Sequence, residues 1–186
     1  MPHIKVIQPE EATGDLKSIY DQLQKQRGQI AEVHKIQSLR PESITKHMDL
    51  YMEIMFSKSQ LSRAQREMMA VVVSKINRCP YCVNHHGSAL NHYWRDAEKL
   101  SKFIENYDEI QLSEKELALC HFAQNLTKDP SQTNDRKDVE GLRNHGFTDE
   151  AILDASLVVS YFNFVNRMVL SLGVTLEEDQ GENYNY

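Results

Sequence analysis

Residues 62–86 read SRAQREMMAVVVSKINRCPYCVNHH, and this stretch predicts two helices joined by a tight turn. Ser62 followed by Gln65 is a capping box, the pattern that begins a helix. Apolar residues between positions 68 and 76 cover most of the circumference of this helix. We therefore expect the first helix to be well buried.

The second helix of this pair begins at two cysteines. Pro80 suits the first helical position, which makes Cys79 the N-cap residue and Cys82 the third helical residue. A helix N-terminus is equivalent to about half a positive charge, and positive potential favours the thiolate, the form of a thiol that reacts. Both sulfurs are therefore placed where their reactivity is raised.

His86 follows Cys82 by four residues, which puts the two side chains on one face of the helix within contact range. His85 points about 100 degrees away by the 3.6-residue period, so His86 is the candidate base. Cys79 and Cys82 are close enough to form a disulfide, so that one sulfur can attack a substrate and the other can resolve the product. The more N-terminal cysteine commonly attacks in such pairs, whereas the register with His86 favours Cys82, which we take as the attacking sulfur.

Glu67 lies twelve residues before Cys79, on a narrow polar line of the preceding helix that runs to Asn77. If the turn brings this line to face the cysteines, the Glu67 carboxylate can hold the imidazole of His86 in one tautomer. Glu67, His86 and Cys82 would then form a proton relay.

The rest of the chain predicts further helices from apolar periodicity, caps and stops. We expect them at residues 10–27, from Pro41 onward, at 94–106, from Ser113 toward Pro130, at 135–144 and at 149–172. In the last of these the polar residues recur at spacings of four, three and four, which leaves nearly every other face apolar and predicts a central helix; they are Ser156, Ser160, Asn163 and Arg167.

The composition supports a helical protein, because only 7 glycines and 5 prolines occur among 186 residues. We predict an all-α fold of about seven to nine helices, with one domain over residues 1–176. The segment 177–186 has nothing apolar enough to bury and is expected to be a flexible tail.

The charge of the chain argues against nucleic acid as a partner. A net charge of −6 gives no basic field for a phosphate backbone. No apolar stretch reaches the roughly 20 residues of a membrane span, and the first residues lack the apolar core of a signal peptide. We expect a cytoplasmic protein that binds no membrane.

Zinc is the alternative use of the cysteine pair, with His85, His86 or His92 as further ligands. A second CxxC is missing, so we expect neither a metal nor another cofactor. Covalent haem attachment would need a histidine directly after the second cysteine, where the chain has Val83. The third cysteine, Cys120, falls in an apolar helical pattern and is expected in the core.

The segment from Glu67 through Cys79, Cys82 and His86 resembles the alkylhydroperoxidase D (AhpD) branch of the carboxymuconolactone decarboxylase superfamily. Its flanks, residues 61–67 and 161–167, are similar to those of the peroxidase-related subgroup, so the resemblance covers about residues 5–175.

This resemblance implies an all-α fold, assembly as trimers or hexamers, and peroxide reduction by the cysteine pair without haem or metal. It implies that Cys82 is oxidised to a sulfenic acid, that Cys79 donates a proton and resolves it, and that Glu67 and His86 relay protons. An external dithiol would reset the enzyme. The position of Tyr81 is occupied by histidine in the best-known member. The rival interpretation is a thiol-disulfide oxidoreductase, or redox partner, that does not reduce peroxides rapidly.

Overall fold

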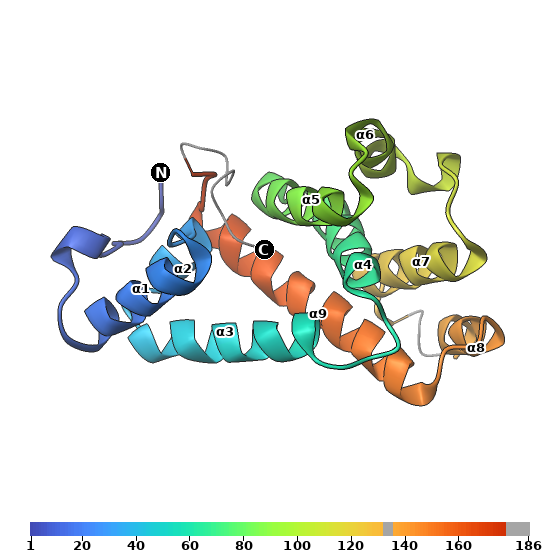
Figure 1. Cartoon of the computed structure of the whole chain (residues 1–186), viewed down its shortest axis with the longest axis horizontal. Coiled ribbons are helices and arrows are strands. Elements are labelled where there is room, and N and C mark those ends of the chain that lie inside the picture. Colours follow the sequence, from blue (N-terminus) through green and yellow to red (C-terminus); the bar gives the residue numbers. More distant parts are fainter. Residues whose placement is uncertain (132–135, 178–186) are drawn as a thin grey trace. The chain divides into compact units, whose positions relative to one another are not determined.

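The computed structural model describes residues 1–131 and 136–177, and all regular elements in those residues are helices (Figure 1). In chain order they are η1 (Pro9–Glu11), α1 (Gly14–Arg27), α2 (Glu32–Lys35), α3 (Pro41–Phe56), α4 (Arg63–Ile76), α5 (Pro80–Trp94), α6 (Ala97–Glu105), η2 (Tyr107–Glu109), α7 (Glu114–Lys128), α8 (Lys137–Asn144) and α9 (Asp149–Leu172). The prediction of an all-α fold is confirmed, and the nine α-helices of the described residues fall within the predicted range.

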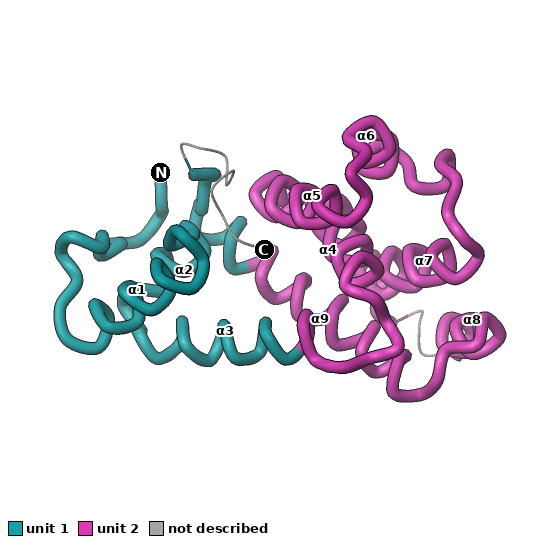
Figure 2. The backbone as a smooth tube through the Cα atoms, in the orientation of Figure 1, with its two compact units in different colours: residues 1–53, 168–186 teal, residues 54–167 magenta. Residues whose placement is uncertain are grey.

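The described residues form two compact units, coloured separately in Figure 2. One unit consists of residues 1–53 and 168–177, and the other of residues 54–167. All the candidate catalytic residues belong to the second unit. A single domain over residues 1–176 stays a prediction, and the predicted tail lies outside the described residues except for Glu177, whose carboxylate accepts a hydrogen bond from the Glu32 backbone N–H at 2.8 Å.

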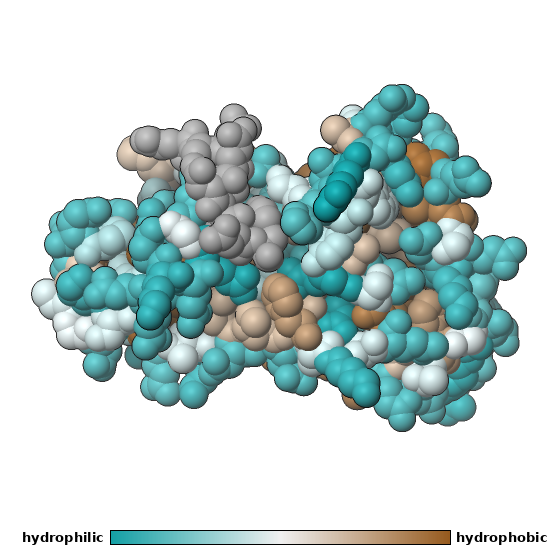
Figure 3. Space-filling model, in the orientation of Figure 1, coloured by the Kyte–Doolittle hydropathy of each residue, from teal (hydrophilic) through white to brown (hydrophobic). Residues whose placement is uncertain are grey.

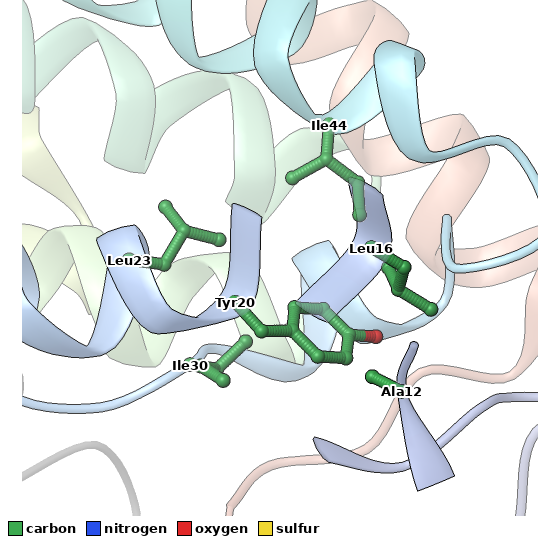
Figure 4. Close-up of a cluster of buried hydrophobic side chains, with 6 residues drawn as sticks. All are labelled: Ala12, Leu16, Tyr20, Leu23, Ile30 and Ile44. Atoms are coloured by element: carbon green, nitrogen blue, oxygen red, sulfur yellow. The ribbon is translucent and has the colours of Figure 1, made fainter. Parts of the chain in front are cut away.

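The first unit has its own apolar core, drawn in Figure 4. The periodic residues of α1 supply one side of it, because their spacing of three and four places them on one face. Gly28 ends α1 in the left-handed conformation, with φ of 81°, as a helix-terminating glycine should. The buried members of this core are Ala12, Leu16, Tyr20, Leu23, Ile30 and Ile44.

Helix α4 is the buried helix of the second unit. All residues from 66 to 74 are buried, and the helix packs against both α5 and α7 (Figure 1). Its predicted capping box is present, with the Gln65 backbone N–H donating to Ser62 Oγ at 3.2 Å and the Ser62 N–H donating to Gln65 Oε1 at 2.9 Å. The capping box at Ser113, which begins α7, is present as well.

The predicted starts of two helices were wrong. The helix placed at 10–27 begins at Gly14, since the residues before Thr13 form a separate 3-10 turn. The helix placed at 94–106 is α6 alone: Trp94 still belongs to α5, Arg95 ends that helix in a left-handed conformation, and Asp96 caps the next. A short helix, α2, was not predicted, and the start of α8 was placed at residue 135, which lies outside the described residues.

Helix α9 has the length and composition of a membrane span, but 44% of its most apolar window is buried within the protein. Its buried residues include Ala155, Val158 and Phe162, as expected of a central helix. Leu153, 59% exposed, and Phe164, 52% exposed, leave part of its surface apolar. Figure 3 shows one face of the molecule, on which hydrophilic residues predominate around smaller hydrophobic patches.

Candidate active site

The turn between α4 and α5 fixes the start of the site. The Cys79 backbone N–H donates to the Ser74 carbonyl at 2.9 Å, and the Arg78 N–H donates to the Lys75 carbonyl at 3.1 Å. These are the two hydrogen bonds of a Schellman cap, in which the residue at the position of Arg78 is usually glycine. Arg78 adopts the left-handed conformation with φ of 54°, which costs a non-glycine residue about 1 kcal/mol.

Cys79 is the N-cap residue of α5 and Pro80 its first residue. Cys79 and Cys82 carry free thiols, and both are buried, with 0% and 1% of their surfaces exposed. The Cys82 thiol donates a hydrogen bond to the Cys79 sulfur, which lowers the pKa of Cys79 despite its burial. The same hydrogen bond, together with burial and the charge on Cys79, raises the pKa of Cys82. The pair therefore loses its first proton more readily than an isolated cysteine would, and its second proton less readily.

Glu67 and His86 form the second part of the site. Glu67 is fully buried, and its Oε2 lies 2.7 Å from Nδ1 of His86. The edge of the His86 ring packs against Phe162, with centroids 4.4 Å apart. The hydrogen bond to the carboxylate fixes Nδ1 as the protonated nitrogen of a neutral ring, so Nε2 is left as the basic atom.

Arg63 compensates the buried charge of Glu67. Its Nη2 lies 2.6 Å from Glu67 Oε1, one helical turn earlier on α4. The guanidinium is itself held in place, because Nη1 donates to the Met55 carbonyl at 3.0 Å and the Phe56 ring lies 3.7 Å from the guanidinium carbon. A buried carboxylate needs such a partner, so Arg63 supports the orientation of Glu67.

A buried amide, Asn166 on α9, completes the surroundings of the pair. Its side chain hydrogen-bonds Cys82, which acts against the other causes that raise the pKa of that thiol. Its Nδ2 also lies 3.2 Å from Ser74 Oγ, and its Oδ1 accepts from Asn77 at 3.0 Å. Asn77 donates at the same distance to Asn163, so the predicted polar lines of α4 and α9 meet here.

A cavity of about 510 Å³ lies beside the cysteine pair. Its lining includes Cys79, the apolar residues Pro80, Val83 and Ile104, and the cationic residues Lys75 and Arg78. Because Cys79 has no exposed surface, a molecule in the cavity must displace a covering side chain to touch the sulfur.

The predicted site residues therefore form two contacts, one between Cys79 and Cys82 and one between Glu67 and His86. Within the described residues no hydrogen bond joins His86 to either sulfur, although Cys82 and His86 share a face of α5. His85 is buried against Tyr81, with ring centroids 4.6 Å apart.

Sequence reasoning missed Arg63 and Asn166. The four-residue spacing from Arg63 to Glu67 was a signal for the first. Asn166 lay in the segment 161–167 that carried the family resemblance, but a contact between helices far apart in sequence leaves no local signal.

Two further expectations concern the third cysteine and a metal site. Cys120 is fully buried in α7, and its burial raises the pKa of its thiol. In residues 1–131 and 136–177, no three His, Cys, Asp or Glu side chains gather as a cluster suited to a metal ion.

Comparison with known families gives one family match. The model of the carboxymuconolactone decarboxylase family matches residues 41–125, which include the candidate site except for the residues of α9, namely Phe162, Asn163 and Asn166. The uncharacterized protein YdfG of Bacillus subtilis (strain 168) is 25% identical over 142 residues, which cover 73% of this chain and 90% of YdfG.

Solved structures extend the likeness to nearly the whole chain. An uncharacterized peroxidase-related protein from Ralstonia eutropha JMP134, described as an alkylhydroperoxidase AhpD core, is 25% identical with a TM-score of 0.86, covering 98% of this chain and 96% of its own. A peroxidase-related protein from Silicibacter sp. TM1040 is 28% identical with a TM-score of 0.85, covering 98% and 97%. The debrominase Bmp8, at 16% identity and a TM-score of 0.79 over 97% of this chain and 95% of its own, shares the fold alone.

Proposed function

Because the chain belongs to the carboxymuconolactone decarboxylase superfamily and has the AhpD-like fold, we propose that it is a thiol-dependent peroxidase. The observation that carries this proposal is the pairing of a fully buried Glu67 with His86 at 2.7 Å, one turn beyond a cysteine pair that shares a proton. The names of the peroxidase-related relatives agree with it.

In the proposed reaction one proton of the pair passes to His86, and the thiolate attacks the terminal oxygen of a hydroperoxide. A sulfur–oxygen bond forms, the oxygen–oxygen bond breaks, and the leaving alkoxide takes the proton back to become an alcohol. The thiol of the other cysteine then condenses with the sulfenic acid, which forms the disulfide and releases water. An external dithiol reduces this disulfide and is itself oxidised.

Two arguments assign the attack to different sulfurs. The helical register with His86 favours Cys82, as does the family resemblance. The lowered pKa of Cys79 and its place in the cavity lining favour Cys79. Since the two sulfurs share one proton, the proposal places the charge on the pair, and replacement of each cysteine in turn decides which sulfur attacks.

Peroxide titration of the reduced protein, with trapping of sulfenic acid and mass spectrometry, tests the proposal. The variant that keeps the attacking cysteine should hold a trapped sulfenic acid, and the variant that lacks it should consume no peroxide. Sulfenic acid on Cys82 in Cys79→Ser supports the register with His86, and sulfenic acid on Cys79 in Cys82→Ser supports the cavity. Oxidation of the pair by peroxide no faster than that of buried Cys120 would contradict a peroxidase.

The rival function is exchange with the disulfide of another protein. Such exchange needs a sulfur that a large partner can reach, but both sulfurs here are at most 1% exposed. Burial therefore favours a small oxidant that enters through a cavity. Rapid reduction of a protein disulfide combined with slow reaction toward every peroxide would favour the rival.

A further inference from the structure

The cavity beside the cysteine pair combines two features that together select a ligand. Its wall is mainly apolar, with Pro80, Val83 and Ile104 around the buried Cys79. Its other two lining residues, Lys75 and Arg78, are both cations with exposed side chains. No carboxylate belongs to this lining; Glu105 and Asp108 line a neighbouring cavity of about 130 Å³, which Lys75 and Ile104 also border.

The two cations make no ion pair with the described residues, so their charges are not neutralised by a contacting carboxylate. Their positions are fixed by the Schellman cap of α4, because Lys75 supplies one carbonyl of the cap and Arg78 occupies its left-handed residue. Glycine would fit that residue without strain, yet the chain places an arginine there, directly before Cys79. Arg95 and Arg136 are left-handed as well, so it is the position of Arg78 directly before Cys79, and not its conformation alone, that makes its side chain a candidate for binding.

We infer that this cavity binds organic molecules that carry a carboxylate on an apolar chain, with the carboxylate at Lys75 and Arg78 and the chain along Pro80, Val83 and Ile104. This inference deepens the proposed function and rests on it for the identity of the substrate, which is then a carboxylate-bearing organic hydroperoxide rather than hydrogen peroxide. The hydroperoxide group of such a substrate would lie toward Cys79. The binding site itself does not depend on the peroxidase reaction.

The first experiment measures the electrostatic potential at Cys79 with two reagents that differ in charge. Alkylation by iodoacetate, an anion, is compared with alkylation by neutral iodoacetamide in full-length Cys82→Ser, whose serine hydroxyl keeps a donor toward Cys79. Uncovering the buried sulfur slows both reagents equally, so it does not change the ratio of their two rates. Peptide mass spectrometry separates Cys79 from Cys120.

A matched pair of variants isolates the contribution of Arg78. Arg78→Gly removes the charge and relieves a left-handed residue, and Arg95→Gly makes the same change at the far end of α5, where Arg95 has φ of 52°. The length of α5, at a rise of 1.5 Å per residue, separates Arg95 from the cysteine pair by about 20 Å. We expect the iodoacetate-to-iodoacetamide ratio to fall about threefold in Arg78→Gly, about tenfold when Lys75→Gln is added, and not at all in Arg95→Gly.

The second experiment tests the apolar wall by protection of Cys79 from iodoacetamide. Octanoate should slow alkylation more than acetate, which lacks the chain, and more than octanamide, which lacks the charge. Arg78→Gly should weaken protection by octanoate, and Arg95→Gly should leave it unchanged.

Equal rate ratios in the two arginine variants, equal protection by octanoate and octanamide, or no alkylation of Cys79 by either reagent would each overturn the inference. These readouts involve no peroxide, so they separate failure of the site from failure of the proposed reaction. If the site is found, a higher kcat/KM for a carboxylate-bearing hydroperoxide than for its neutral ester is the expected result. Equal values would overturn the substrate assignment and leave the binding site standing.

Discussion

Replacement of Glu67 by glutamine tests the central contact of the site. The change keeps the shape of the side chain and removes one negative charge that Arg63 and His86 share, at 2.6 and 2.7 Å. Breaking a buried ion pair by removal of one partner costs about 3–5 kcal/mol. The Arg63 side chain is 12% exposed and keeps its hydrogen bond to the Met55 carbonyl, so we expect the low end, about 3 kcal/mol of the free energy of unfolding.

For a chain of this length, a loss of about 3 kcal/mol lowers the melting temperature by about 9 °C. Differential scanning calorimetry measures this change. In the same variant the rate of peroxide-dependent oxidation should fall at least about 100-fold, because His86 loses the group that orients it as a base. Glu98→Gln is the matched control, since Glu98 and Lys102 form the same kind of one-turn ion pair at 2.6 Å on the exposed surface of α6.

The control should keep both the melting temperature and the oxidation rate of the wild type, because exposed ion pairs contribute little. If Glu67→Gln is no less stable than Glu98→Gln, the buried pair is not the stabilising contact that its geometry indicates. If stability falls but oxidation is unchanged, Glu67 has a structural role only.

Further changes test other parts of the chain. Asn166→Ala should cost about 1–3 kcal/mol of the free energy of unfolding in denaturant titrations, because its buried partners Ser74 and Asn77 lose their hydrogen bonds; an unchanged free energy would contradict a structural role for this amide beside Cys82. Burial lowers the pKa of His47 from 6.5 to about 4, so the neutral ring stabilises the fold above pH 6.5 and this stability is lost as the pH falls toward 4. Between pH 7 and 5 the wild type should therefore lose about 2 kcal/mol more of its free energy of unfolding than His47→Gln does, as measured in denaturant titrations. Equal losses in the two proteins would contradict the lowered pKa of His47. Gly87→Ala should raise the melting temperature by about 2 °C, because alanine favours a helix over glycine and its Cβ would lie 3.5 Å from Ile104 of α6, an ordinary contact; a lower melting temperature would show that α5 and α6 leave no room for the methyl group.

Helix starts marked by a capping box were the most predictable part of the fold. Ser62 and Ser113 were identified correctly because a capping box uses a local pattern of four residues, which the rest of the chain does not alter. The boundary at Trp94 was missed for the opposite reason: nothing local forbids a helix through Arg95, and its left-handed conformation is set by how α5 and α6 pack.

The candidate site also has one part that the sequence predicts and one part that it does not. The contact between Glu67 and His86 was predicted from two helix registers and one turn, and the two atoms lie 2.7 Å apart. Asn166 contacts Cys82 from a helix more than 80 residues away in sequence, and the periodicity of a sequence does not predict such long-range contacts. The cavity lining could not be predicted from the sequence either, because Ile104 comes from α6, whose position against α5 depends on tertiary packing.

The three-residue connection between α4 and α5 has a consequence for how related chains can vary. One residue added between Asn77 and Cys79 would break the two hydrogen bonds of the Schellman cap and change the direction in which α5 leaves it, so Cys82 and His86 would be displaced from Glu67 even if every reactive side chain were retained. The interval of twelve residues from Glu67 to Cys79 is therefore a structural requirement that can be read directly from a sequence. A homologue that keeps the residues but not the interval should be suspected of having lost the chemistry.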